Sequence, residues 1–327
     1  MARVAILEQS VLIDVDPVAE MATGLGARFG GGARFSLVLA QAFPGIADED
    51  VPGIMDRAGD EHGFEVFEVV PAVAARTRTH VAGTARRRGA GLVYLAGLPL
   101  MRADATLIGE FESRRRAIAM VKDIAEQAAE AGAESVMITS GRLDAGADHD
   151  EAVSRLVESF IELAVFAAEH APGVMLRLEP TDTDLQHRQL VGSTELALSI
   201  VRRVRAAGQA MDVNLDLSHL IELGEVPRDS LAIAAFACRH VHLANCAIEV
   251  GHPLRGDRHP PFGTPGTEVG IVELASGVDD LRSTGYLSGE PVSIIGLEVT
   301  PLTGDDAWST LSRAVADLDS ALASAGQ

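Results

Sequence analysis

The sequence predicts a (β/α)8 TIM barrel, an α/β fold in which eight parallel strands alternate with helices. Eight short apolar runs rich in β-branched residues recur along the chain, and longer segments typical of helices separate them. Such alternation implies right-handed βαβ units, and eight of them close most naturally into a barrel. A doubly wound open sheet also alternates, but no Gly-x-Gly-x-x-Gly turn follows the first strand. The 327 residues, 47% hydrophobic, suit one such domain.

The expected elements follow one another from about residue 34 to the end. Two segments, 110–134 and 148–172, combine good helix formers with a charged outer face and predict long helices. Residues 1–33 precede the barrel as an N-terminal extension that ends in a glycine-rich stretch, and we expect a flap or a subunit contact there. The barrel domain is expected over 34–327. The predicted strands are 35–40, 64–70, 91–96, 135–140, 174–179, 211–216, 240–245 and 293–298.

Charge and composition exclude several classes of partner. The chain has 27 Lys and Arg against 47 Asp and Glu, a net charge of −20 that repels nucleic acid and anionic lipid headgroups. We therefore expect neither nucleic-acid nor membrane binding, and a nuclease is disfavoured. The start of the chain is unlike a signal peptide, and no long uncharged apolar run occurs. Two cysteines, Cys238 and Cys246, are expected to be buried thiols, so we expect a soluble cytoplasmic protein.

Polar residues close four of the apolar runs, where a barrel of this kind binds its substrates. Glu179, Asp216 and Glu298 end their runs, and His242 lies within a fourth. A carboxylate at the tip of a buried strand is costly unless it is paired, hydrogen-bonded or metal-bound. Three carboxylates and one imidazole would suit Mn²⁺, Mg²⁺, Co²⁺ or Zn²⁺. Taken singly, each acid could instead cap a helix, and His242 could be a core histidine.

With these residues in place, the sequence resembles the xylose isomerase-like barrels, which include sugar isomerases, sugar-phosphate isomerases and ketose 3-epimerases. The resemblance extends from about residue 34 to the end. It implies one divalent metal ion, Mn²⁺ foremost, held by Glu179, Asp216, His242 and Glu298, with His219 near metal and substrate. The motifs that carry it are LEP (178–180), GSTELAL (192–198), DLSH (216–219), HVH (240–242) and LE (297–298).

This residue set predicts chemistry on a sugar or polyol. A metal that chelates adjacent carbonyl and hydroxyl oxygens stabilises the enediolate formed when the neighbouring C–H proton leaves. The resemblance implies that Glu179 and Glu298 act as acid and base on opposite sides of the substrate carbon. His219, three residues after Asp216, would face the same side if the chain turns helically. There it would bind a substrate oxygen or an additional metal position, although it could instead face solvent.

We therefore expect an isomerase or epimerase that acts through a metal-stabilised enediolate. Dehydration and β-elimination start from the same intermediate, so a metal-dependent lyase on a keto-sugar or keto-glycoside is the alternative. A non-catalytic sugar-binding barrel subunit is a third possibility. Either a homo-oligomer or a hetero-oligomer is compatible with the sequence.

The histidine-rich stretch 240–263 is expected to reach the barrel mouth. We expect His242 to face the interior, and His240 to pack between strand and helix as a structural residue. Residues 251–266 are too rich in Gly and Pro for a helix, so they predict an ordered loop over the mouth. Such loops carry specificity, although these side chains could instead hold the loop's own backbone. The candidate substrate contacts are Asn245, His252, Arg255, Asp257, Arg258 and His259.

The sequence also departs from the family pattern. Asn245 and Ile248 stand where many relatives carry an acid and an arginine, TDTDLQ (181–186) replaces the Asn-Arg pair of ketose epimerases, and PPFGTPG (260–266) replaces Pro-Gly-Glu-Gly. The metal set is thus better supported than any ketose or phosphate specificity. Arg255 and Arg258 could supply the missing contacts, and Arg142 or His149, after the fourth strand, could reach the mouth.

Overall fold

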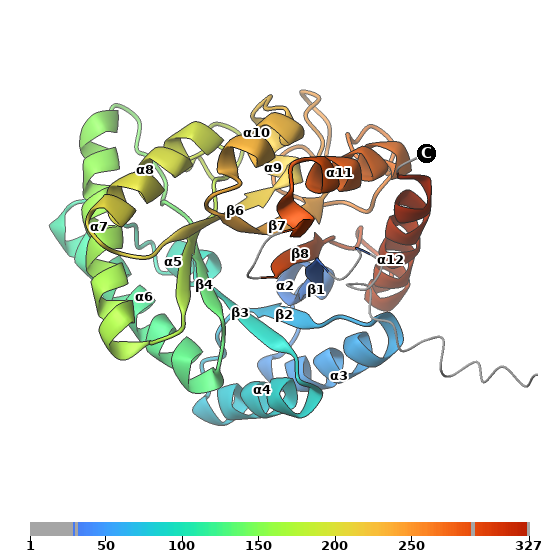
Figure 1. The fold of residues 1–327 in the computed structure, drawn as a ribbon, viewed down its shortest axis with the longest axis horizontal. Helices are drawn as coiled ribbons and strands as arrows, with labels where there is room; N and C mark the ends of the chain where they lie inside the picture. Colours follow the sequence, from blue (N-terminus) through green and yellow to red (C-terminus); the bar gives the residue numbers. More distant parts are fainter. Residues whose placement is uncertain (1–28, 30–31, 289–291, 326–327) are drawn as a thin grey trace, which may run out of the picture.

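The computed structural model describes residues 29, 32–288 and 292–325. Most of the predicted extension, residues 1–33, therefore lies outside the described residues. Eight parallel strands form a closed barrel in the order β1 to β8, which confirms the predicted fold. Figure 1 shows the helices arranged as a ring around these strands.

Every predicted strand overlaps an observed one, and the ends agree within two residues. The agreement follows from the apolar, β-branched runs, which suit strands buried on both faces. The strands are β1 (Ala33–Val38), β2 (Val66–Val69), β3 (Gly91–Leu95), β4 (Ser135–Ile138), β5 (Met175–Leu178), β6 (Asp212–Asp216), β7 (Cys238–Ala244) and β8 (Ser293–Glu298).

The two long predicted helices are observed as α6 and α7. The carboxylate of Asp148 accepts a hydrogen bond from the backbone N–H of Glu151 (3.0 Å) and so caps the start of α7. Short helices α2, α5 and α9 follow directly after β1, β3 and β6. The α-helices are α2 (Leu39–Ala42), α3 (Val51–His62), α4 (Ala75–Arg88), α5 (Gly97–Arg102), α6 (Phe111–Ala131), α7 (His149–His170), α8 (Thr194–Ala206), α9 (Leu217–Glu222), α10 (Pro227–Ala234), α11 (Ile271–Ser283) and α12 (Ala307–Ser324), and two 3₁₀ turns are η1 (Asp48–Asp50) and η2 (Tyr286–Ser288).

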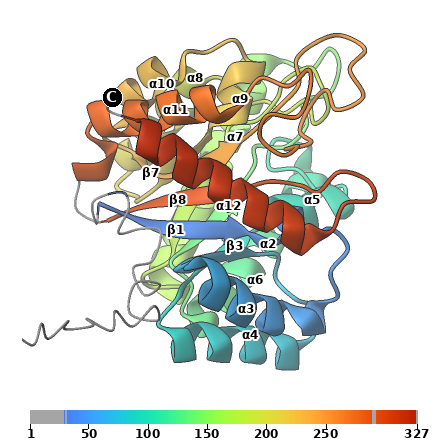
Figure 2. The ribbon, with the colours of Figure 1, turned by 90° about the vertical axis from the view of Figure 1, so that its right-hand side faces the viewer.

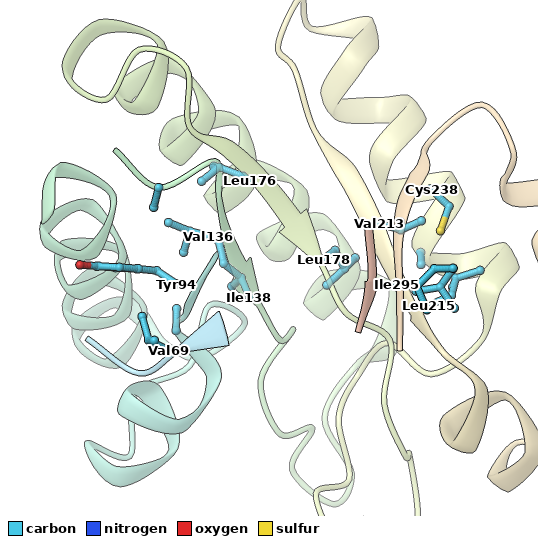
Figure 3. Close-up of a cluster of buried hydrophobic side chains, with 14 of the residues drawn as sticks. Val69, Tyr94, Val136, Ile138, Leu176, Leu178, Val213, Leu215, Cys238 and Ile295 are labelled. Carbon is cyan, nitrogen blue, oxygen red and sulfur yellow. The ribbon is translucent and has the colours of Figure 1, made fainter. Parts of the chain in front are cut away.

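Two separate apolar clusters stabilise the barrel. The larger one packs strands against helices and includes Tyr94, Ile138 and Leu178, which Figure 3 shows on neighbouring strands. The smaller one consists of buried side chains from β2, β3, β4 and β8, with Leu95 against it. Because strand residues alternate between faces, we place the smaller cluster inside the barrel. Its members are Val66, Val93, Met137 and Ile294.

The rest of the barrel interior is polar. Glu68, Asn214 and His240 are fully buried, and Arg177 is nearly so. Barrel interiors are usually filled by branched apolar side chains, and buried polar groups are costly unless they are hydrogen-bonded. This polar interior therefore requires a hydrogen-bond network.

Long connections gather at the carboxyl ends of the strands. In Figure 2 the connection after β7 (orange) lies at the end of the barrel toward which β1 points. Between β7 and α11 this connection has no helix, only an isolated bridge between Ala247 and Arg255. It is the ordered loop that its Gly and Pro content predicts. Among the described residues, no helix has the length and apolar character needed to cross a membrane.

Candidate metal and substrate site

The four predicted metal ligands converge at the carboxyl ends of neighbouring strands. Glu179 follows β5, and Asp216, His242 and Glu298 lie in β6, β7 and β8. One ligand atom of each lies within 4.8 Å of those of the others. Nδ1 of His242 is 2.7 Å from Oε2 of Glu298, 3.4 Å from Oε1 of Glu179 and 3.8 Å from Oδ2 of Asp216. Hard oxygen donors with one imidazole suit a divalent cation.

The two carboxylate oxygens of Asp216 have different surroundings, and one of them is available to a cation. Oδ1 accepts hydrogen bonds from the backbone N–H and the hydroxyl of Ser218, both at 2.6 Å, and so caps α9. Oδ2 is buried and has no hydrogen-bond partner among the described residues. A buried acceptor without a partner is destabilising. Because Oδ2 lies beside the other three groups, a cation there would complete its contacts.

Burial and neighbouring charges shift the pKa values of three of the four candidate ligands. Burial alone would lower the pKa of His242, but the carboxylates of Glu68 and Glu298 raise it well above its ordinary value. Burial opposes ionisation of Asp216, yet the surrounding histidines, first His219, lower its pKa. Burial raises the pKa of Glu298. Like charges brought this close favour the binding of an added cation.

A second group of potential ligands adjoins the first. Asp216, His219 and His259 also offer atoms within 4.8 Å of one another, and all three are buried. The first turn of α9 brings His219 to the same side as Asp216, as their spacing predicts. Nδ1 of His219 is 3.1 Å from Oε2 of Glu222. The catalytic role of His219 stays a prediction.

Two predicted residues of the loop after β7, Asp257 and His259, lie at the site. Nε2 of His259 pairs with Oδ1 of Asp257 and lies 3.5 Å from Oε1 of Glu298. The other oxygen of Asp257 is 2.6 Å from Nε2 of His187. Burial alone would lower the pKa of His259, but Glu298 and Asp257 raise it to about 10. An imidazolium thus lies beside one of the two predicted acid/base glutamates.

Four other predicted substrate contacts do not line the cavity at the site. Arg255 donates from Nε to the carbonyl of Ile248 (3.1 Å), and His252 accepts through Nδ1 from a backbone N–H within the loop (3.2 Å). Asn245 is fully buried, and its amide bonds to backbone groups of the same loop. Arg258 is exposed. These placements match the alternative, in which such residues maintain the loop, and their contact with substrate stays a prediction.

Arg142 and His149 also lie apart from this cavity. Both are exposed and line a neighbouring depression of about 430 Å³. Gln189 lines both spaces.

The cavity holds about 310 Å³ and has two unlike walls. One wall comes from the carboxyl ends of β5 to β8 and the segments after them. It is polar, and it carries three of the candidate ligands, Glu179, His242 and Glu298, with His187, His219, Asp257 and His259. The opposite wall comes from β1 to β4 and the residues after them, and it is largely apolar. Its apolar residues are Val38, Val70, Leu95, Leu98, Met101 and Met137.

Glu68 was not among the predicted site residues, and His240 was expected in a different place. Glu68 lies in β2, is fully buried, and is 3.0 Å from Nε2 of both His240 and His242. The expectation that His240 packs between strand and helix was wrong, because residues two apart on a strand face the same side. The available signal was an acid in the middle of an apolar strand. Asn214 was missed as well, and its Nδ2 donates to Oε1 of Glu179 (2.8 Å).

The sequence pattern of the xylose isomerase-like TIM barrel family matches residues 57–307. The chain belongs to this family. Several solved structures share its fold. An L-ribulose 3-epimerase is 18% identical, with 90% of this chain and 95% of that chain covered and a TM-score of 0.68.

Two further structures are similar over most of their length. A 3-keto-D-glucoside 4-epimerase from E. coli is 18% identical, covering 88% of this chain and 99% of that one, with a TM-score of 0.63. A D-psicose 3-epimerase from Clostridium cellulolyticum H10, solved with D-tagatose, is 17% identical, covering 89% and 98%, with a TM-score of 0.62. A search of curated proteins finds no match. At these identities the likeness concerns the fold.

Proposed function

We propose that this protein is a divalent-metal-dependent isomerase or epimerase of a sugar or polyol, with Mn²⁺ as its cation. The observation that carries the proposal is the convergence of Glu179, Asp216, His242 and Glu298 around the unpartnered Oδ2 of Asp216. The similar structures are those of an L-ribulose 3-epimerase, a D-psicose 3-epimerase and a 3-keto-D-glucoside 4-epimerase, which supports a sugar substrate.

Glu179 and Glu298 are the proposed proton carriers. A divalent cation held by the four ligands would polarise substrate oxygens and so favour loss of the proton from the adjacent carbon. One glutamate would take that proton and the other would return one to the carbon. Asn214 orients Glu179 by donating to Oε1, and His259 lies beside Oε1 of Glu298. General acid/base catalysis requires such accurate placement.

A lyase that acts on a keto-glycoside is the second candidate, and the apolar wall of the cavity favours it. A sugar with free hydroxyl groups all round gains little from Leu98, Met101 and their apolar neighbours, whereas an apolar aglycone would bury surface there. His259, charged and at the cavity edge, could give a proton to the departing oxygen or carbon.

One experiment separates these functions. The protein is incubated in D₂O with Mn²⁺ and either L-ribulose, D-psicose or a 3-keto-glucoside that carries an aromatic aglycone. An epimerase incorporates deuterium at carbon and otherwise conserves the substrate, whereas a lyase releases water or the aglycone. EDTA should abolish either reaction. If the protein binds no Mn²⁺ and turns over none of these compounds, the proposal fails and a non-catalytic sugar-binding barrel is favoured.

A further inference from the structure

A chain of buried hydrogen bonds runs through the polar interior of the barrel to the candidate metal site. We infer that Glu68 is a positioning residue which, with Arg177 behind it, holds His242 in the tautomer whose Nδ1 lone pair faces the site. The inference rests on the proposed cation binding for its function.

The chain begins at Arg177 in β5. NH1 of Arg177 donates to Oγ of Ser135 (2.9 Å) and lies 3.3 Å from Nδ1 of His240. A guanidinium group has donors and no acceptor. Nδ1 of His240 must therefore accept, and the proton of this ring sits on Nε2.

The second contact joins His240 to Glu68. Nε2 of His240 is 3.0 Å from Oε1 of Glu68, and the hydroxyl of Ser36 donates to the same oxygen at 2.6 Å. Glu68 is fully buried, and these donors together with His242 surround its carboxylate. Ser36 and His240 both donate to Oε1, and an ionised Glu68 balances the buried charge of Arg177, so we take the carboxylate to accept from every neighbour.

The third contact, between Glu68 and His242, determines which nitrogen of His242 carries the proton. Nε2 of His242 is 3.0 Å from Oε2 of Glu68, so Nε2 carries the proton. Nδ1, which lies 2.7 Å from Oε2 of Glu298, is then the nitrogen that gives up its proton and turns its lone pair to the site when a cation binds. Partners behind a ligating histidine commonly select its tautomer and fix the orientation of its ring.

The opposite charges of Arg177 and Glu68 and the absence of a side chain at Gly296 both favour this arrangement. Arg177 and Glu68 bring opposite charges into the barrel, which offsets part of the cost of burying either one. Gly296 lies directly across from His242 in β8. A Cβ there would be 2.6 Å from Cδ2 of His242 and 2.7 Å from Oε1 of Glu68. The contact between Glu68 and His242 therefore needs a glycine at this position.

The first test compares Mn²⁺ affinity by competition with a chelator. Glu68→Gln conserves size but places an amide N–H against an imidazole N–H, so one ring must turn or change tautomer. We expect the Kd for Mn²⁺ to rise about 10- to 100-fold. Glu134→Gln is the matched control, because it makes the same change at a partly exposed ion pair with Arg34; its Kd should stay near that of the wild type. A folded Glu68→Gln protein with wild-type affinity would overturn the inference.

The second test uses the wild-type protein, so it tests the inferred role of Glu68 even if Glu68→Gln does not fold. In ¹⁵N-histidine spectra of the wild-type protein with Zn²⁺, long-range correlations should place the proton of both His240 and His242 on Nε2. A proton on Nδ1 of His240 would contradict the proposed sequence of donors and acceptors from Arg177 to His242. Failure of the wild-type protein to bind Mn²⁺ or Zn²⁺ would instead count against the proposed function, so the two failures are distinguishable.

Discussion

Asp216 shows how one side chain combines two roles that the sequence presents as alternatives. A strand-end acid can cap the following helix or bind at the mouth of the barrel. Here Oδ1 caps α9 through Ser218, while Oδ2 remains at the site without a hydrogen-bond partner among the described residues. The two roles are compatible because a carboxylate has two oxygens, each with its own acceptor sites.

The two proposed proton carriers can be tested by isosteric change. Glu179→Gln and Glu298→Gln each retain an oxygen toward the cation but lose the ability to take up a proton. We expect kcat for deuterium exchange to fall by about 10²- to 10⁴-fold, while Mn²⁺ remains bound. Glu134→Gln, at a partly exposed ion pair with Arg34, is the control and should keep its activity. Unchanged kcat in either site variant would exclude that glutamate as a proton carrier.

Gly296 provides a steric test at the same scale. In Gly296→Ala the new methyl group would overlap both His242 and Glu68. We expect the free energy of unfolding in urea to fall by about 1–3 kcal/mol, together with weaker Mn²⁺ binding. Gly53→Ala is the control, because Gly53 lies in α3 with no atom near its missing Cβ. That change should raise stability by about 0.5–1 kcal/mol, and a neutral Gly296→Ala would refute the steric argument.

At the scale of elements, the segment after β5 is organised by a single buried carboxylate. Asp182 is 1% exposed and accepts backbone N–H groups at 2.8 Å from Leu185, Gln186 and His187. This turn places His187 against Asp257, and thereby connects two loops that come from different strands. Both His187 and Asp257 line the polar wall of the cavity.

Removal of this carboxylate should loosen the loop. In Asp182→Asn one oxygen becomes an amide that no longer accepts, so at least one of these backbone N–H groups loses its partner. We expect the free energy of unfolding to fall by about 1–3 kcal/mol, and KM to rise more than kcat falls. Asp184→Asn, an exposed neighbour in the same loop, serves as control. Equal effects of both variants would show that the backbone contacts of Asp182 do not organise the site.

At the scale of the whole molecule, the acidic net charge of −20 and the four-strand site both favour cation binding. The ligands come from β5 to β8, so a bound ion would link neighbouring strands of the barrel. A ligand that binds only the folded state stabilises it in proportion to the logarithm of its free concentration.

Thermal unfolding tests this linkage. Mn²⁺ at 100 times its Kd should add about 2.7 kcal/mol to the stability of the folded state, and calorimetry should show a higher Tm that EDTA reverses. Asp216→Asn should lose most of this shift because its amide would replace the unpartnered oxygen. A Tm that does not respond to Mn²⁺ would contradict a shared ion at this site.

The sequence by itself determined the barrel, because eight apolar runs at regular intervals leave few other ways to bury them. It also determined which strand-end residues meet, since parallel strands bring their carboxyl ends to one face. Only the tertiary structure showed that Asp257 and His259, but not His252 or Arg255, line the cavity. The path of a loop of this length depends on contacts with other loops, and no local pattern encodes those. The role of Glu68 likewise became visible only with closure of the barrel, because its histidine partners lie more than 170 residues away along the chain.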